Sequence, residues 1–541
     1  MKRRDFLRVG SMAAGAAVAG PVRAGGAQAG GPSRQQGEVP AFELEEATIA
    51  DLQKAMESGR ETSRSLVEKY IGRIEALDRK GPALRQVLEV NPDALDVAAR
   101  LDEERKSGRV RGPLHGIPVL VKDNVGTADR MTTTAGSLAL EGSIPPEDSF
   151  VARRLRDAGA VILGKTNMSE WANFRSTRSV SGWSGRGGLG RNPYVLDRNT
   201  SGSSSGTGAA IAANYAAVGI GTETDGSIVS PSNNCCLVGI KPTVGVVSRT
   251  GIIPIAHSQD TAGPMARTVA DAAALLGAMA GNDPADPVTR ASAFRGRSDY
   301  TKFLHPQGLN GARIGVPREH LFGQNPHADR LVDAALAAMR EAGAEIVDPV
   351  ALEAGKVGDA EFEVLLYEFK ADLNAYLAGL GPKAPAKSLA DLIAFNDRNA
   401  GREMPWFGQE IFLMAEKKGP LTDEAYLKAL ATCRRLARVE GIDRVLTQHK
   451  LDALVAPTSG PPHLTDLAIG DYGPGGCSTL PAVAGYPHVT VPAGFAFGLP
   501  IGVSFFGAAF SEPTLIRLAY AYEQATKHRR PPRFLRTAEL A

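Results

Sequence analysis

The sequence lacks several features that would assign it to a specialised class of protein. Its formal net charge is only +2, from 61 basic and 59 acidic residues, so it has no basic surplus of the kind that nucleic-acid-binding proteins carry. Four cysteines in 541 residues cannot form a disulfide scaffold, although one isolated disulfide stays open. No segment after the first thirty residues reaches the ~18 consecutive apolar residues of a transmembrane helix. We therefore expect a soluble globular protein.

The first 29 residues follow the order that is typical of a signal peptide. A basic start (Lys2, Arg3, Arg4) precedes a stretch rich in alanine and glycine over 7–20, and residues 27–29 (Ala-Gln-Ala) fit a cleavage site. The sequence RRDFL at 3–7 resembles the twin-arginine motif, whose pathway exports folded proteins. We expect a signal over 1–29, a linker over 30–43, and a periplasmic or secreted mature protein that has no further contact with the membrane.

Short apolar runs alternate with longer helical patterns along the rest of the chain. Because such alternation is typical of helices covering both faces of a sheet, the sequence predicts an α/β fold. A helical segment is expected over 44–106, with Thr48 as an N-cap. The expected strands are 117–121, 161–163, 217–220, 313–316, 344–347, 454–456, 488–491 and 502–505. The expected helices are 149–158, 207–215, 268–280, 328–342, 361–378, 424–440 and 513–528. No repeat or spacer divides the chain after residue 40, which favours one large domain.

Two segments rich in glycine and serine stand out from this pattern. Residues 200–208 read TSGSSSGTG and lead into an alanine-rich helix, but no lysine follows them, so they are not a phosphate-binding P-loop. Residues 218–231 read VGIGTETDGSIVSP, an apolar strand that runs into a tight turn. Successive backbone N–H groups in such a turn can bind an oxyanion. Ser227 at its end is a candidate nucleophile, and the alternative is an ordinary serine in a turn.

A serine nucleophile needs a base, and Lys122 is the best candidate. No GxSxG elbow surrounds Ser227, and neither His115 nor His257 lies in a diagnostic context. Lys122 ends the apolar segment HGIPVLVK, at the sheet edge where sites collect in open α/β folds. Desolvation lowers the pKa of an ammonium group, so a neutral amine could act as a base near pH 7 there. The alternative is an ordinary surface lysine.

Together these segments resemble the amidase signature family. The resemblance rests on VLVKDN around Lys122, on SGSSSGT at 201–207 and on TETDGSI at 222–228, and Ser203 and Ser227 are 24 residues apart, as in that family. The segments 238–255 and 259–273 also resemble its signature region, as do 451–458 and 484–494 near the C-terminus. Within the family, the likeness is closest to the bacterial peptide amidases, on TETDGSIV, GKTNMSEWANFR (164–175), LLYEFKADL (365–373) and SLADLIAFN (388–396).

The resemblance implies a fold and a mechanism. The fold would be one α/β/α domain over 44–535, around a mixed, mostly parallel sheet flanked by helices. Ser227 would attack the carbonyl carbon of an amide, and Ser203, after a cis peptide bond, would pass the proton to Lys122. Backbone N–H groups of residues 224–227 (Thr224, Asp225, Gly226 and Ser227) would form the oxyanion hole. The expected activity is hydrolysis of the C-terminal amide of peptides, with release of ammonia through an acyl-enzyme and with no metal or organic cofactor.

Several residues are weaker candidates or departures from the family pattern. Asn173 and Ser204 are candidates for substrate positioning and loop support. Asp225 stands where glycine is usual and could narrow the oxyanion turn, and Cys236 also replaces a usual glycine, as a small buried filler. The aromatic residues that could line a peptide cleft, or instead pack in the core, are Trp171, Phe174, Tyr367 and Trp406.

Three alternative functions remain open at this point. One is a general aliphatic or aryl amidase of the same family. A second is a component of a transamidase that works on charged tRNA, against which the export signal and the near-neutral charge argue. A third, of another class, is a non-catalytic exported solute-binding protein, which would not need a lysine and two serines at the family's spacing. We expect a monomer whose partner is a small amide or an amidated peptide, and no nucleic acid.

Overall fold

The computed structural model describes residues 39–290, 299–353, 357–472 and 475–539. The expected signal peptide, 1–29, and the first part of the expected linker lie outside the described residues. The folded elements run from α1 (Ile49–Glu57) to α17 (Glu512–Thr526) within one compact unit. None of the described helices is long and apolar enough to cross a bilayer.

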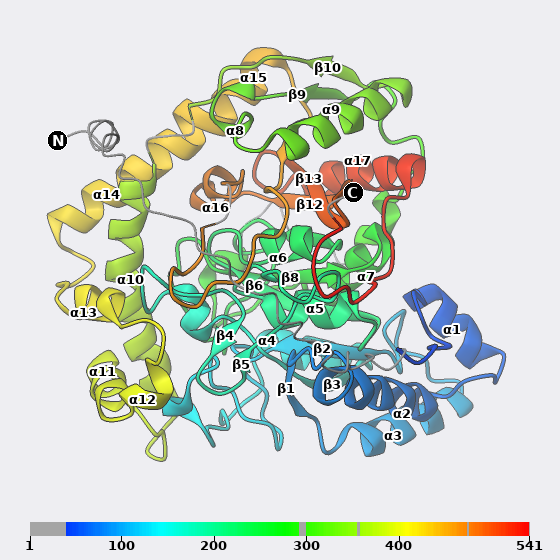
Figure 1. The fold of residues 1–541 in the computed structure, drawn as a ribbon, viewed down its shortest axis with the longest axis vertical. Coiled ribbons are helices and arrows are strands. Elements are labelled where there is room, and N and C mark those ends of the chain that lie inside the picture. Colours follow the sequence, from blue (N-terminus) through cyan, green and yellow to red (C-terminus); the bar gives the residue numbers. More distant parts are fainter. Residues whose placement is uncertain (1–38, 291–298, 354–356, 473–474, 540–541) are drawn as a thin grey trace, which may run out of the picture. The chain divides into compact units, whose positions relative to one another are not determined.

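Eleven strands within the described residues form one mixed sheet (Figure 1). Their spatial order is β1-β3-β2-β6-β8-β7-β12-β13-β11-β9-β10. The bounds are β1 Val87–Val90, β2 Pro118–Lys122, β3 Val161–Thr166, β6 Val218–Glu223, β7 Val238–Lys241, β8 Thr261–Ala266, β9 Arg313–Gly315, β10 Glu345–Val347, β11 Ala453–Pro457, β12 His488–Ala496 and β13 Leu499–Phe506. A separate hairpin pairs β4 (Trp183–Ser184) with β5 (Gly188–Leu189).

The sheet confirms a mixed α/β fold, but parallel pairing does not predominate in it. The pairs β2–β3, β2–β6, β9–β11 and β9–β10 are parallel. The other six neighbouring pairs are antiparallel. The expectation of a mostly parallel sheet was therefore wrong in degree. Two of the central strands, β7 and β8, had not been identified, because Gly263 and Pro264 interrupt the β8 pattern and β7 has only four residues.

The helices that cover the sheet include every expected one, with shifted ends. The described helices are α2 Ser63–Ile74, α3 Ala94–Lys106, α4 Phe150–Asp157, α5 Ser205–Ala212, α6 Val229–Asn234, α7 Val269–Met279, α8 Arg318–Leu321, α9 Pro326–Glu341, α10 Gly358–Gly379, α11 Leu389–Arg398, α12 Ala400–Glu403, α13 Glu410–Glu416, α14 Glu424–Arg434, α15 Asp443–His449 and α16 Thr479–Ala484, besides α1 and α17. The π-helical segment Arg435–Ile442 continues α14. Thr48 caps α1 as expected, in a capping box with Asp51.

The apolar core falls into a large cluster and smaller ones. The large cluster joins the central strands to α5, α7 and α17. A second cluster packs buried residues of α10, among them Leu366 and Phe369, against Trp171 and Ile255. In Figure 1, α10 to α14 (yellow-green to yellow) form a helical layer of their own beside the central strands. In this layer α11 and α13 share the second cluster with α10, and α14 packs on α10 in a third cluster.

Candidate active site

The site begins where two parallel strands end side by side. Lys122 is the last residue of β2, and Thr222 lies at the end of the neighbouring β6. The Nζ atom of Lys122 lies 2.7 Å from Oγ of Ser203, 2.9 Å from Oγ1 of Thr222 and 3.2 Å from the Thr222 carbonyl oxygen. The lysine is completely buried, and burial lowers its pKa to about 7 even though the Asp260 and Glu223 carboxylates act to raise it. Lys122 is thus buried and hydrogen-bonded, not a surface lysine.

Ser203 is placed by the loop that enters α5. It is fully buried, and the peptide bond between Gly202 and Ser203 is cis, as the resemblance implied. A Cβ atom at Gly202 would lie 2.2 Å from Oγ of Ser169, so only glycine fits there. Ser204 holds the loop to β6, because its Oγ donates to the Thr222 carbonyl at 3.1 Å and accepts from the Thr222 N–H at 3.2 Å. Ser204 therefore holds this loop to β6.

The turn after β6 leaves backbone donors free around Ser227. Gly226 has a φ of +76°, and an added Cβ would lie 2.9 Å from Oγ of Ser230. The Glu223 carboxylate fixes the turn by accepting from the N–H groups of Ile228 and Val229, at 2.7 and 3.0 Å. Within the described residues, the N–H groups of residues 225–227 have no hydrogen-bond acceptor. These donors are available for an anionic oxygen.

The two serine segments are joined directly and open into one cavity. The backbone N–H of Ser204 donates to the carbonyl oxygen of Ser227 at 3.1 Å. The cavity has a volume of about 380 Å³, and both Ser203 and Ser227 line it. Ser227 keeps 7% of its surface exposed, whereas Ser203 is sealed. Of the two hydroxyl groups, that of Ser227 is the one a ligand can reach.

The weaker candidates separate into lining and supporting residues. Trp171 lines the cavity. Asn173 does not, and its side chain instead exchanges hydrogen bonds with Ser181 beside Gly202. Phe174 packs in the core against Phe369, so it is not a lining residue. Neither Tyr367, whose hydroxyl donates to Asp423, nor Trp406, which is half exposed, lines this cavity.

The two departures from the family pattern have structural explanations. The Asp225 carboxylate turns toward α16, where Oγ1 of Thr479 donates to it at 2.8 Å, and Asp225 does not line the cavity. Burial raises the pKa of Asp225, while its hydrogen bonds with Ser478 and Thr479 act to lower it. Cys236 is buried with 1% exposure, as a filler would be. All four cysteines are free, so the isolated disulfide that had stayed open is not formed.

Sequence reasoning missed the residues that support the oxyanion turn from behind. Asp260 accepts from Oγ1 of Thr224 at 2.5 Å and from the N–H groups of Ile255 and Ala256. Burial raises the pKa of Asp260 to about 6, against the hydrogen bond from Thr224. Gln259 donates to the Thr224 carbonyl at 3.3 Å and to Glu361 of α10 at 2.8 Å. Both residues lie in the segment QDTAGP at 259–264, which resembles the signature region of the family, so this segment could have pointed to them.

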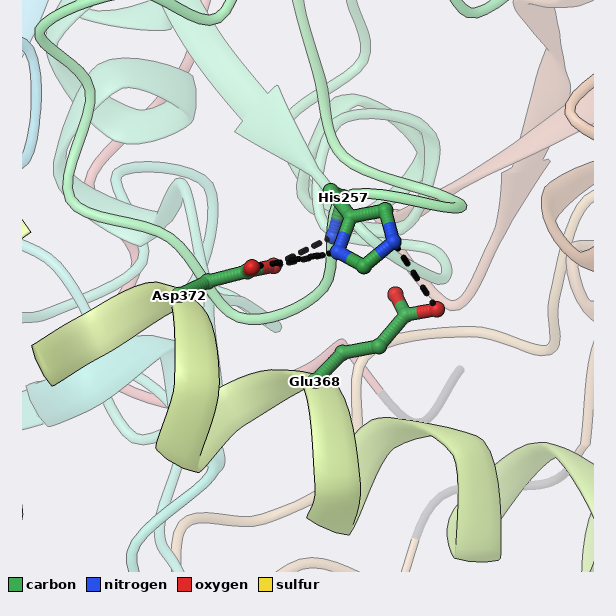
Figure 2. Close-up of side chains that lie close together, drawn as sticks. All are labelled: His257, Glu368 and Asp372. Carbon is green, nitrogen blue, oxygen red and sulfur yellow. Dashed lines mark hydrogen bonds and ion pairs between the residues drawn. The ribbon is translucent and has the colours of Figure 1, made fainter. Parts of the chain in front are cut away.

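Two lining residues of the cavity, His257 and Asp372, belong to the one group of described residues with the composition of a metal site. The third member is Glu368, and the possible ligand atoms all lie within 4.8 Å of one another. Figure 2 shows the imidazole ring between the two carboxylates of α10. Nδ1 lies 2.9 Å from Asp372 and Nε2 lies 3.5 Å from Glu368. The two carboxylates face opposite nitrogens of the ring, an arrangement suited to an ion-paired clamp rather than to sharing one cation.

This clamp ties the segment before β8 to the helical layer. The Asp372 carboxylate also accepts from the His257 N–H at 2.8 Å, and Glu368 accepts from the Ser258 N–H at 2.9 Å and from the hydroxyl of Tyr426 at 2.7 Å. Because the hydrogen bond with Asp372 outweighs the effect of burial, the pKa of His257 is raised. Segment 255–260 therefore connects α10 to the oxyanion turn.

Comparison with known proteins identifies the same family on independent grounds. A family model described as Amidase matches residues 65–516. A probable amidase of Arabidopsis thaliana is 44% identical over 504 residues, which cover 91% of this chain and 93% of that protein. The solved structure of the native peptide amidase of Stenotrophomonas maltophilia is 54% identical, with a TM-score of 0.88 over 91% of this chain and 100% of that one. A glutamyl-tRNA(Gln) amidotransferase subunit of Moorella thermoacetica is 35% identical over 514 residues, covering 91% of this chain and 99% of that protein.

The fold, the site and these similarities agree on the class of protein. The family match spans most of the chain, and the buried lysine and the serine loops lie within it. The chain belongs to the amidase signature family. It is a hydrolase that acts on amides, which removes the non-catalytic solute-binding protein from the alternatives.

Proposed function

We propose that this amidase removes the C-terminal amide group of peptides and releases ammonia. The observation that carries the proposal is the 2.7 Å contact between Nζ of Lys122 and Oγ of Ser203, beside Ser227 at the floor of an open cavity. The 54% identity to a peptide amidase along the whole of that enzyme supports the peptide substrate. The apolar lining from Trp171, Ile253 and Ile255 suits the side chain of the amidated residue.

The first half of the proposed reaction forms an ester on Ser227. Oγ of Ser227 attacks the amide carbonyl carbon, and its proton passes to Oγ of Ser203 while Ser203 gives its own proton to the neutral amine of Lys122. The free N–H groups of residues 225–227 stabilise the oxyanion, and each such donor contributes about 3–4 kcal/mol. When the C–N bond breaks, Lys122 returns the proton through Ser203 to the leaving nitrogen, which departs as ammonia.

The second half returns the enzyme to its starting state. A water molecule takes the place of ammonia and attacks the ester carbonyl, while Ser203 and Lys122 accept its proton as before. The ester bond then breaks, Ser227 regains its proton, and the peptide leaves with a free carboxyl group. A lysine with a pKa of about 7 can exist in both the neutral and the charged form near neutral pH, which both halves require.

The experiment that tests this function compares amides that differ only at the leaving nitrogen. A capped peptide amide, its N-methylamide, the free acid and a small free amide are incubated with the enzyme, ammonia or methylamine is measured, and mass spectrometry follows the peptide backbone. We expect ammonia from the peptide amide and no cleavage of internal bonds, and no turnover by Ser227→Ala with unchanged circular dichroism. Reaction of small free amides alone would instead establish a general amidase, and full activity of Ser227→Ala would refute the mechanism.

We further propose that residues 1–29 direct the folded enzyme out of the cytoplasm. The basic start, the twin arginine and the cleavage pattern support this proposal. We expect the wild-type protein in the exported fraction with a new N-terminus near residue 30, and the double variant Arg3→Lys, Arg4→Lys in the cytoplasm. N-terminal sequencing of both fractions measures this, and an intact Met1 in exported protein would contradict it.

A further inference from the structure

A second cavity adjoins the active one on the far side of segment 257–259. It has a volume of about 410 Å³, slightly larger than the active cavity. Arg249 and His257 line both cavities, so the rim of the active cavity is also a wall of the second. Its apolar lining comes from Val364 of α10, from Leu430 of α14 and from Tyr486. A molecule bound at Ser227 that extends past His257 would therefore enter this second cavity.

The charged side chains that line the second cavity are all basic. Three guanidinium groups line it, those of Arg249, Arg434 and Arg438, and no aspartate or glutamate does. Arg249 is neutralised by Asp286. Arg438 donates to the carbonyl oxygen of Ala484 at 2.8 Å and has no carboxylate partner in the described part of the chain. Arg434 likewise has no ion pair there. Two positive charges thus face the space uncompensated.

The nearby carboxylates do not line the cavity, and within the described residues none of them forms an ion pair with Arg434 or Arg438. Glu368 accepts from the Ser258 N–H and from Tyr426, and Asp372 is held by His257. Glu361 accepts from Gln259, and burial raises its pKa well above the usual range, which favours its neutral form. In contrast, the Ser258 hydroxyl is buried in the wall of the cavity with no hydrogen-bond partner among the described residues. The site therefore offers unpaired donors and cations to a ligand.

We propose that this cavity binds a carboxylate group, and that its source is an acidic side chain on the N-terminal side of the scissile amide of the substrate. The cavity would make the enzyme selective for acidic peptide amides. This inference rests on the proposed peptide amidase function. The same chemistry could serve a free organic acid that binds as an effector, and the experiment distinguishes the two sources.

The test uses acetyl-capped tripeptide amides in which glutamate or methionine occupies the first or the second position. Methionine is neutral and of similar length, and it adds no second amide. We expect kcat/KM to be about fivefold higher for glutamate at one of the two positions, the size of a partly exposed ion pair, and the preference to shrink as salt is raised to 0.5 M. In Arg434→Gln the preference should become smaller, because only Arg438 then faces the cavity without an ion pair, and in the double variant Arg434→Gln, Arg438→Gln it should disappear.

The matched control is Arg435→Gln, the next residue along the chain. Arg435 is exposed, pairs with Glu440 at 2.6 Å and does not line the cavity, so this variant should keep the preference. A wild-type enzyme without any preference, or a preference that survives in the double variant Arg434→Gln, Arg438→Gln, would overturn the substrate source. A free-acid effector would be shown if N-acetylglutamate changed turnover of the methionine peptides in wild type but not in this double variant.

Failure of this inference can be told apart from failure of the proposed function. If the methionine peptide amides are hydrolysed without charge preference, and N-acetylglutamate has no effect, the function stands and the anion site is refuted. If no peptide amide is hydrolysed, the function is refuted, and titration calorimetry with N-acetylglutamate on wild type and on the double variant Arg434→Gln, Arg438→Gln decides about the cavity. Binding by wild type alone would support the anion site, and equal or absent binding would refute it.

Discussion

The two walls of the active cavity are built in different ways. On the sheet side, Lys122 and Ser203 are fully buried and lie within 2.7 Å of each other. On the helical side, the His257 side chain is 44% exposed and Asp372 is 21% exposed, although they too are in contact. Burial strengthens electrostatic interactions and shifts pKa values, whereas exposure weakens both. In the proposed mechanism the chemical step therefore falls to the sheet side, and the helical side is left to contact the rest of the substrate.

The largest effect should come from removing the amine of the sheet wall. Lys122→Met keeps the length of the side chain but cannot accept a proton, so we expect kcat to fall by about 1,000-fold or more, within the usual range for a lost general base. Removing the buried ammonium relieves its desolvation, but it leaves Ser203 and Thr222 without these hydrogen bonds. Because the two effects oppose each other, the melting temperature should stay within a few degrees of wild type. Single-turnover ammonia release and differential scanning calorimetry measure the two quantities.

A second buried lysine supplies the control for this prediction. Lys165 of β3 is also completely buried, and burial lowers its pKa to about 8. Its Nζ donates to the Val125 carbonyl and to Thr133. Burial raises the pKa of Asp123 to about 6, against the charge of Lys165. Lys165→Met leaves the two buried oxygens without this donor and should destabilise the protein by about 3 kcal/mol, with kcat of the folded fraction unchanged. Equal loss of kcat in both variants would refute the special role of Lys122.

The second effect concerns the pH at which the sheet wall becomes active. Since Lys122 must be neutral to accept a proton and its pKa is about 7, kcat/KM should rise with pH to a plateau, with a midpoint near 7. The Asp260 carboxylate stabilises the ammonium form. In Asp260→Asn the pKa of Lys122 should fall, more amine should be neutral at pH 6, and the rising limb should move to lower pH.

A carboxylate elsewhere in the fold shows whether this shift is local. Asp271 of α7 is buried and its pKa is raised to about 6 by burial, as for Asp260, but it accepts from the Ile49 N–H and does not line the cavity. The pH profile of Asp271→Asn should match that of wild type. A limb that moves to higher pH in Asp260→Asn, or one that moves equally in both variants, would contradict the electrostatic link between Asp260 and Lys122.

The sheet wall could be predicted from sequence because its residues lie within contiguous patterns. Lys122 ends an apolar run, and the two serine segments have a recognisable spacing, so neighbouring strands bring them together by the topology of an α/β sheet. A glycine such as Gly226 also indicates a tight turn, since its positive φ and the close approach of Ser230 leave room for no other residue. For the sheet wall, the sequence segments alone therefore indicate which residues lie together in the fold.

The helical wall could not be predicted because its contacts join distant segments. His257 meets Asp372 across 115 residues, and Gln259 meets Glu361 across 102. Either acidic residue, read alone on an amphipathic helix, is indistinguishable from a solvent-facing charge. The strands β7 and β8 were not predicted from the sequence for a related reason. Each is stabilised by neighbouring strands on both sides, which compensates for its short or interrupted apolar pattern.

The third effect is a change in binding rather than in chemistry. Asp372→Asn removes the charge that holds the His257 ring, which loosens the helical wall around substrate and product alike. We expect KM for a peptide amide to rise by about threefold, a typical effect for a partly exposed ion pair, with kcat unchanged because the loss is equal in ground and transition state. Steady-state ammonia release measures both constants. A fall in kcat comparable to that of Lys122→Met would place Asp372 in the chemical step instead.

The smallest effect is on stability, and the direction in which it changes with pH differs between the two walls. The pKa of His257 is raised by the hydrogen bond with Asp372, against desolvation, while Glu368 also raises it and Arg249 lowers it. A raised pKa means that the clamp stabilises the fold fully below the unfolded value of about 6.5 and loses this contribution as pH rises through the folded pKa. Wild type should therefore exceed Asp372→Asn in melting temperature by more at pH 5.5 than at pH 9, by an amount worth less than about 1 kcal/mol. For buried Lys122, whose pKa is lowered to about 7, the sign is opposite. The change in stability on replacing it with methionine should be more favourable at pH 5.5, where the folded protein carries the buried charge, than at pH 9, where the buried amine is neutral.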